Sequence, residues 1–87
     1  MKLVLAPHVF AREFDGELVL LDLDGGEYFG LDAVGAAIWR SLGTTGTLDG
    51  AVRAVVTEFD VDEPRARQDV TALVAELEQR GIVQREP

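Results

Sequence analysis

The sequence predicts an α+β domain, a three-stranded antiparallel sheet followed by three helices. Two patterns predict it. The first third of the chain holds short runs rich in Val, Leu and aromatic residues between Asp-Gly turns, which is typical of strands. Through the remainder, apolar residues recur at helical spacing, with capping residues between the runs. The 87 residues contain no repeat, low-complexity segment or linker, so one domain, 1–87, is expected.

Two turn signals separate the predicted strands. Val9–Phe14 is a short strand candidate, and Asp15-Gly16 after it marks a tight hairpin turn. Residues 17–23 (ELVLLDL) favour a central strand that is covered over at least part of both faces. Asp24-Gly25-Gly26 gives the second turn, and Glu27–Leu31 the third strand. No later strand is predicted, so both edges of this sheet are expected to be uncovered.

The first two helices each follow a capping residue. Asp32 and Thr47 stand where an N-cap belongs, because their side-chain oxygens accept from the free amides of the first turn. Gly43 is placed to end the first helix in the left-handed conformation. Behind the caps, apolar residues repeat at helical spacing: Val34, Ile38 and Leu42, then Leu48, Ala51, Val52, Val55, Val56 and Phe59.

Asp62 is expected to cap the third helix, with Pro64 in the first turn, where a missing N–H costs little. Gly81 is the expected C′ residue, and Ile82 can fold back as the hydrophobic contact of a Schellman motif. The apolar residues of this helix span an arc that can cover the core and still leave a margin beside the sheet: Ala66, Val70, Leu73, Val74 and Leu77.

Acidic residues dominate the charge, with a net value of −8. From residue 13 to residue 39 there are seven acids and no base, which disfavours binding to duplex DNA. The acidic stretch is either a solvated surface or a rim that steers a basic partner segment. No run is apolar enough for a membrane span, and the start lacks the features of a signal peptide, so a cytoplasmic location is expected.

Residues for catalysis or metal binding are scarce. There is no Cys, and the single His, His8, lies beside Pro7 in what is expected to be a solvated N-terminal arm. Asp22 and Asp24 share a strand face, but the remaining ligands of a cation loop are missing. The sequence therefore predicts no metal, no cofactor and no enzymatic activity.

The third predicted strand offers a binding surface. Glu27–Leu31 contains neither Pro nor Lys, the residues that commonly blunt an exposed edge. Tyr28 and Phe29 point to opposite faces, so one of them is free to face a groove. At an edge, this strand is a template for strand addition by an extended peptide.

Two segments, LDLDGGEYFGLDAVGAAIWRSL and TLDGAVRAVVTEFDVDEPRARQDVTALVAELEQRGIV, resemble the PqqD-like family across nearly the whole chain. These proteins are RiPP recognition elements, where RiPP denotes a ribosomally made, post-translationally modified peptide. Three features carry the resemblance: a Tyr-containing strand leading into Ile38-Trp39, a Thr47-capped helix, and Arg67-x-Asp69-Val70 opening the last helix. The length and the DAVGAAIW helix look most like the discrete recognition proteins of lasso-peptide biosynthesis.

The resemblance implies a winged helix-turn-helix-like fold that binds the leader segment of a precursor peptide. The leader would add to the third strand and lie between that strand and the third helix. The implied partners are a separate leader peptidase of the Cys-His type and a macrolactam cyclase. The implied peptide-binding residues are Glu27, Tyr28, Phe29, Gly30 and Leu31 on the strand, with Arg67, Val70, Thr71 and Val74 on the helix.

Other functions stay open at this point. Within the family, the alternative is a peptide chaperone for a radical-SAM maturase. Outside it, the alternatives are an accessory subunit or a winged-helix DNA-binding protein, although the third helix has no basic face. An exposed edge can also pair with itself, so a weak homodimer through the strand edge is expected in concentrated samples.

Overall fold

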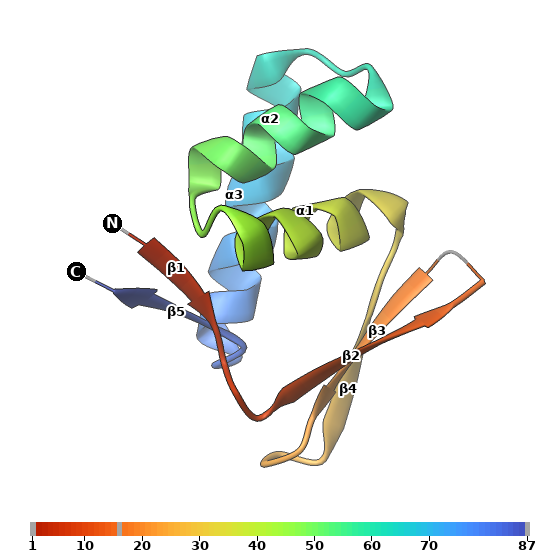
Figure 1. The fold of residues 1–87 in the computed structure, drawn as a ribbon, viewed down its shortest axis with the longest axis vertical. Coiled ribbons are helices and arrows are strands. Elements are labelled where there is room, and N and C mark those ends of the chain that lie inside the picture. Colours follow the sequence, from red (N-terminus) through yellow and green to blue (C-terminus); the bar gives the residue numbers. More distant parts are fainter. Residues whose placement is uncertain (1, 16, 87) are drawn as a thin grey trace.

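The computed structural model describes residues 2–15 and 17–86 and contains two sheets and three helices (Figure 1). The predicted turn at Asp15-Gly16 includes Gly16, which lies outside the described residues. The elements in chain order are β1 (Lys2–Leu5), β2 (Val9–Phe14), β3 (Glu17–Asp22), β4 (Glu27–Leu31), α1 (Ala33–Thr44), α2 (Leu48–Phe59), α3 (Glu63–Gln79) and β5 (Val83–Glu86).

The predicted three-stranded antiparallel sheet is confirmed, in the order β2-β3-β4. Leu20 of β3 lies opposite Phe29 of β4, and Leu18 lies opposite Leu31, so these residues share the face that packs on the helices. The intervening residues, such as Tyr28, lie on the outer face, because side chains alternate along a strand. The sheet thus has one face in the core and one face in solvent.

The second sheet pairs the two ends of the chain and was not predicted. β1 and β5 are antiparallel, with Leu3 opposite Arg85 and Leu5 opposite Val83. The expectation that no strand follows the last helix was therefore wrong. Both strands are four residues long, and their pairing joins distant parts of the sequence, which local patterns do not reveal. β5 leaves β4 uncovered: in the described residues, β4 pairs only with β3.

Two of the three predicted N-caps make their side-chain hydrogen bond, whereas Asp62 precedes α3 without one. Asp32 accepts from the amide of Gly35 at 2.8 Å, and Thr47 accepts from the amide of Gly50 at 3.0 Å. The predicted end of the first helix at Gly43 was wrong, because α1 continues to Thr44. The left-handed residue is Gly46, with φ of 68°.

The C-terminal end of α3 forms the predicted Schellman motif. Gly81 has φ of 75°, and its amide donates to the carbonyl of Glu78 at 3.0 Å. The amide of Ile82 donates to the carbonyl of Leu77 at 2.9 Å, and the Ile82 side chain is buried. This turn directs the chain back along the molecule into β5.

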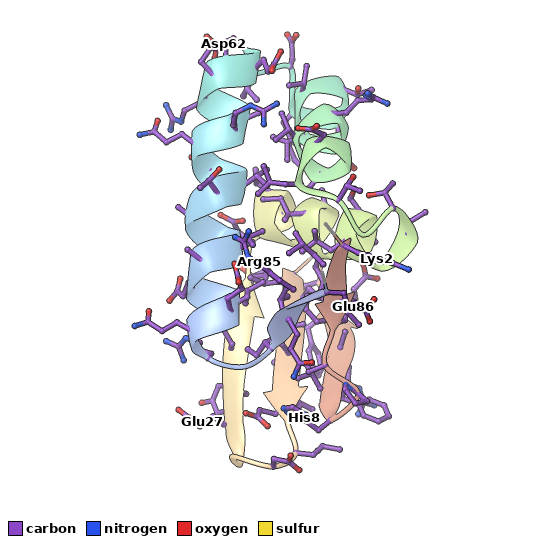
Figure 2. The ribbon with its side chains drawn as sticks, turned by 90° about the vertical axis from the view of Figure 1, so that its left-hand side faces the viewer. Lys2, His8, Glu27, Asp62, Arg85 and Glu86 are labelled. Carbon is purple, nitrogen blue, oxygen red and sulfur yellow. The ribbon has the colours of Figure 1, made fainter. Side chains whose placement is uncertain are left out.

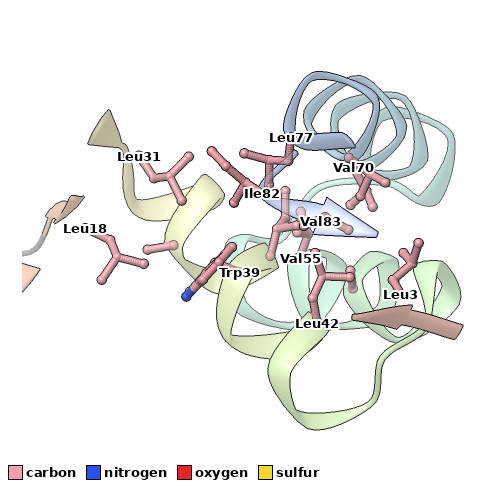
Figure 3. Packing of buried hydrophobic residues seen from close by; sticks show 14 of the residues in the cluster. Leu3, Leu18, Leu31, Trp39, Leu42, Val55, Val70, Leu77, Ile82 and Val83 are labelled. Atoms are coloured by element: carbon pink, nitrogen blue, oxygen red, sulfur yellow. The ribbon is translucent and has the colours of Figure 1, made fainter. Parts of the chain in front are cut away.

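One hydrophobic cluster joins all three helices to both sheets (Figure 3). Trp39, the only Trp of the chain, is 7% exposed within it, so it is a core residue. On α3, the residues that enter this cluster are Ala66, Val70, Val74 and Leu77. Among the described residues, no helix is both long and apolar enough to cross a membrane.

A groove between a free strand edge and α3

The uncovered edge of β4 borders a groove of about 660 Å³ whose other wall is α3. Figure 2 shows α3 beside β4, with Asp62 at the top of the view, where α3 begins, and Glu27 near the bottom, where β4 begins. The groove is lined by Phe29, Gly30 and Leu31 of β4, by Asp32, Val34, Gly35 and Ile38 at the start of α1, and by Arg65, Asp69, Ala72, Leu73 and Glu76 of α3.

The groove has an apolar floor and a charged rim. Leu31, Val34, Ile38 and Leu73 supply apolar side chains from three different elements. Along the rim, Arg65 and Asp69 pair at 3.6 Å, and further along Glu76 pairs with Arg80 at 3.6 Å. Exposed pairs of this kind contribute about 0–1 kcal/mol each, so they shape the rim more than they stabilise the fold.

The guanidinium group of Arg80 lies over the ring of Phe29, one of the groove-lining residues. Its guanidinium carbon lies 4.7 Å from the centroid of the Phe29 ring, within the range of a cation–π interaction. Both residues line a second hollow of about 360 Å³. Its other lining residues are Glu27, Tyr28, Asp22, Leu20, Gln79 and Ile82. Phe29 thus lines both the groove and the smaller hollow, whereas Arg80 lines only the smaller hollow.

The structure places the predicted strand residues at this surface. Phe29, Gly30 and Leu31 line the main groove, whereas Glu27 lines the smaller hollow. Tyr28 is 76% exposed; it belongs to the outer face of the sheet and borders the smaller hollow. Phe29 is thus the aromatic residue that faces the helix, and Tyr28 the one that faces away.

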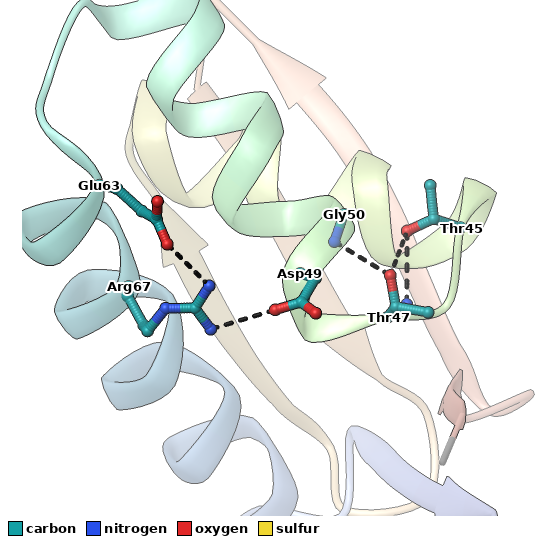
Figure 4. A network of polar contacts seen from close by, with 6 residues as sticks. All are labelled: Thr45, Thr47, Asp49, Gly50, Glu63 and Arg67. Carbon is teal, nitrogen blue, oxygen red and sulfur yellow. Dashed lines mark hydrogen bonds and ion pairs between the residues drawn. The ribbon is translucent and has the colours of Figure 1, made fainter.

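The predicted helix residues are not brought to the groove. Val70 and Val74 are 0% exposed and belong to the core. Arg67 lies on the side of α3 that faces α2, where it pairs with Asp49 and Glu63, each at 3.1 Å (Figure 4). These two hydrogen bonds, the one to Glu63 first, raise the pKa of Arg67 above its ordinary value. Thr71 is exposed and is not among the groove-lining residues.

The residues of α3 that do line the groove follow a helical repeat of their own. Arg65, Asp69, Ala72, Leu73 and Glu76 stand at i, i+4, i+7, i+8 and i+11, which is one face of a helix. This face is only partly apolar, so hydrophobicity alone selects the neighbouring core face instead. The sequence signal that could have located this groove-lining face of α3 was the set of charged residues at helical spacing from Ala72 and Leu73.

The cations of α3 do not form a DNA-binding face. Arg65, Arg67 and Arg80 each pair with at least one carboxylate within 4 Å. DNA affinity depends on Lys and Arg that neutralise phosphates. On α3 and at its C-cap, these side chains are therefore engaged with carboxylates of the same protein.

His8 is held near the second turn of the sheet rather than in a loose arm. Its Nε2 lies 3.6 Å from a carboxylate oxygen of Asp22, and its Nδ1 lies 3.8 Å from one of Asp24. Asp22 also accepts from the amides of Asp24 and Gly25, each at 3.0 Å, so it holds the turn. In the described part of the chain, no cluster of His, Cys, Asp and Glu has an arrangement that could hold a metal ion.

A free strand edge beside a partly apolar groove, on a sheet that packs against α1, defines a small peptide-recognition domain. The family model described as "Coenzyme PQQ synthesis protein D (PqqD)" matches residues 17–83. The chain therefore belongs to the PqqD family, as a PqqD-like RiPP recognition element.

Two solved structures are similar over nearly the whole chain. One is "TbiB1 in Complex with the TbiA(beta) Leader Peptide", which is 33% identical, with a TM-score of 0.86, and covers 100% of this chain and 99% of that chain. The other is "Lasso peptide synthetase B1 complexed with the leader peptide", 27% identical, with a TM-score of 0.86, covering 98% of this chain and 100% of that chain. No curated protein sequence matches.

Proposed function

We propose that this protein binds the leader segment of a ribosomally made precursor peptide as an added strand on β4. The observation that carries the proposal is the free edge of β4 beside the partly apolar groove against α3. Both similar solved structures are complexes with leader peptides, which supports it. The protein then presents the bound leader to separate enzymes that modify or cleave the precursor.

Strand addition uses both parts of the site. The unpaired N–H and C=O groups of β4 supply main-chain hydrogen bonds, which give affinity without regard to sequence. Alternate side chains of the guest enter the groove, where Leu31, Val34 and Leu73 provide apolar contacts. The contacting residues that we propose are therefore Glu27–Leu31 of β4 with Arg65, Asp69, Ala72, Leu73 and Glu76 of α3.

We place the protein in lasso-peptide biosynthesis, as a cytoplasmic, non-catalytic component. Its partners are a leader peptidase of the Cys-His type and a macrolactam cyclase, which supply the chemistry. The coverage and TM-scores of the two lasso-type structures favour this assignment. The second candidate is a peptide chaperone for a radical-SAM maturase, which the description of the matching family favours. Co-purification with a peptidase or with a radical-SAM enzyme separates the two.

The first test identifies the guest. The N-terminal segments of all small open reading frames of the encoding genome are displayed and selected on the folded protein, with the TbiA(beta) leader peptide as the reference probe. We expect one precursor-like segment to be enriched; this segment is called the probe peptide below. Enrichment of folded proteins but of no segment would favour an accessory subunit and contradict the proposal.

The second test asks whether the probe peptide binds as a strand. Each backbone amide of the probe peptide is N-methylated in turn, and the Kd is measured by fluorescence polarisation. In a paired strand, successive amides point alternately toward and away from the neighbour. We therefore expect losses at every second position only. A uniform loss, or losses spaced three or four residues apart as in a helix, would contradict strand addition.

A further inference from the structure

The outer face of the β2-β3-β4 sheet, turned away from the helices, gathers exposed hydrophobic side chains. Four large ones are exposed in the described part of the chain: Phe10 (64%), Phe14 (57%), Leu23 (64%) and Tyr28 (76%). Phe10 and Tyr28 belong to one row across the sheet, because Leu21 of β3 lies opposite both. Alternation along the strands places Phe14 of β2, and Leu23 just beyond β3, on this face as well. These four side chains and Leu21 are called the outer patch below.

The composition of the outer patch is that of an interface. Single exposed apolar residues are ordinary, whereas contiguous exposed patches mark interaction sites. Aromatic residues are also enriched at the centres of protein–protein interfaces. The patch is about 10 Å wide across its three strands and about 20 Å long. This area is below the roughly 800 Å² that each partner of a stable complex buries. The patch therefore suits a transient partner more than a permanent subunit.

The ends of the outer patch are acidic. Between its ends, the basic residue that the described chain places on this face is Arg12, whose guanidinium carbon lies 6.0 Å from the centroid of the Phe14 ring. An apolar centre with acidic ends complements a partner surface that has an apolar centre and Lys or Arg at its ends. The ends carry exposed carboxylates, two near the β2–β3 turn and two near the β3–β4 turn: Asp15, Glu17, Asp24 and Glu27.

A second copy of this chain fits the outer patch poorly. Two sheets that pack face to face in the aligned manner keep their strands within about 30° of each other. Because both ends of the patch are acidic, either strand direction then places carboxylates of one copy against carboxylates of the other. Such like-charge contacts are unfavourable, and the net charge of −8 adds to the repulsion. The patch therefore favours a different partner with a basic surface.

From these observations we infer that the outer patch is the docking surface for the leader peptidase, through an apolar surface of that enzyme bordered by Lys and Arg. The inference rests on the proposed function, since it needs a leader bound on β4. A macrolactam closes on a free amine, which cleavage of the leader releases. The peptidase is therefore the enzyme that must act while the leader is still bound to this protein. Tyr28 makes the patch continuous with β4, the strand that carries the leader.

Docking and peptide binding then use different surfaces of the same sheet. The leader pairs with the edge of β4 and contacts Leu73 in the groove on the inner side. The peptidase contacts Phe10 and Phe14 of β2, two strands away on the outer side. The carboxylates at the ends of the patch attract a basic surface and raise the association rate, an effect that salt screens. The acidic stretch 13–39 thus acts on the enzyme and not on the peptide.

The test separates docking from peptide binding with the double variant Phe10→Thr, Phe14→Thr. Both rings are exposed and Thr suits a strand, so the fold is retained, which circular dichroism verifies. The probe for docking is the Cys-His leader peptidase of the encoding genome, with its catalytic Cys changed to Ala so that the complex persists. Its Kd is measured by biolayer interferometry on the protein loaded with the probe peptide.

We expect the Kd of the peptidase to rise at least about tenfold in the double variant, while the Kd of the probe peptide stays within about twofold of wild type. Val4→Thr, on β1 of the other sheet, is the matched control and leaves both values unchanged.

A second set of variants tests the steering by charge. Glu17→Gln with Asp24→Asn removes one carboxylate from each end of the outer patch. Glu58→Gln with Asp60→Asn makes the same change in net charge on the exposed surface at the end of α2 and is the control. We expect the first pair to lower the association rate of the peptidase about threefold or more at low salt, and this difference to disappear near about 0.5 M salt. The control pair should leave the rate close to that of wild type.

The outcomes separate this inference from the proposed function. If the probe peptide binds but the double variant keeps the wild-type Kd for the peptidase, or if the loaded wild-type protein does not bind the peptidase, the inference fails and strand addition stands. An equal loss in Val4→Thr also overturns it, because the effect then does not depend on the outer patch. A dimer of the wild-type protein in sedimentation that the double variant abolishes would assign the patch to a second copy. If the probe peptide does not bind wild type, the proposed function itself fails.

Discussion

Substitution of two leucines one helical turn apart on α3, Leu73 and Leu77, distinguishes effects on peptide binding from effects on the stability of the fold. Leu77 is 0% exposed in the core, whereas Leu73 is partly buried and lines the groove. Leu77→Ala removes three buried carbon atoms and leaves a cavity, so we expect it to lower the free energy of unfolding by about 2–5 kcal/mol. For 87 residues the total is on the order of 4–13 kcal/mol, so this loss is a large fraction of it.

Leu73→Ala should act mainly on the guest. The wild-type side chain is covered further when a peptide fills the groove, and each newly buried CH₂ contributes about 0.8 kcal/mol. Since part of Leu73 is already buried against the core, we expect about 1–2 kcal/mol of binding free energy to be lost, or roughly 5- to 30-fold in Kd. Its effect on the free energy of unfolding should be smaller than that of Leu77→Ala.

Urea unfolding followed by Trp39 fluorescence gives the stability of each variant, because this buried side chain is the only Trp. Fluorescence polarisation with the probe peptide gives Kd under conditions where both variants are folded. The reasoning is refuted if folded Leu73→Ala keeps its Kd within twofold of wild type. It is also refuted if Leu73→Ala destabilises the fold more than Leu77→Ala does.

Three further predictions concern charge. The Kd of the probe peptide should change less than about threefold up to about 0.5 M salt, because salt screens main-chain hydrogen bonds and apolar contacts little. A steep salt dependence would instead indicate that the peptide binds to the acidic stretch 13–39. Arg67→Ala should leave Kd unchanged and lower the urea midpoint slightly, because Arg67 joins α2 to α3 away from the groove. A tenfold loss of affinity would instead indicate that Arg67 contacts the peptide. The hydrogen bond that Arg85 donates to Glu78, 2.6 Å long, lowers the pKa of Glu78. Above the ordinary carboxyl pKa, the free energy of unfolding of the wild-type protein should therefore exceed that of Glu78→Gln. This difference should disappear as the pH falls through the lowered pKa of Glu78. Urea midpoints measured from neutral to acid pH test this, and a constant difference would contradict it.

Local sequence signals located the elements that carry the site. The strands Val9–Phe14 and Glu27–Leu31 were predicted with their observed bounds, since turn residues and strand-forming side chains mark them directly. The caps Asp32 and Thr47 and the left-handed Gly81 were likewise predicted, because each acts within one turn of chain. The free edge of β4 was predicted because no later strand was expected; β5 does follow α3, but it pairs with β1 and leaves β4 paired only with β3 in the described residues.

Signals of longer range were missed. β1 and β5 pair the two ends of the chain, and neither four-residue segment has a pattern that identifies its partner. The end of α1 was misplaced at Gly43, because two glycines near the helix end are equivalent until the geometry of the following turn selects Gly46. His8 was expected in a solvated arm, whereas the β1–β2 connection holds it near Asp22.

By itself, the sequence determined the α+β class and the strand Glu27–Leu31, because periodicity, turn residues and capping are properties of adjacent residues. The third helix as the neighbour of that strand was implied by the resemblance to the PqqD-like family. The sequence also determined the family, through the order and spacing of those elements. Only the tertiary structure decided which side of α3 meets the groove. The rotation of a helix against a sheet depends on packing between distant segments, which buries Val70 and Val74 in the core, turns Arg67 toward α2 and leaves Ala72 and Leu73 beside β4.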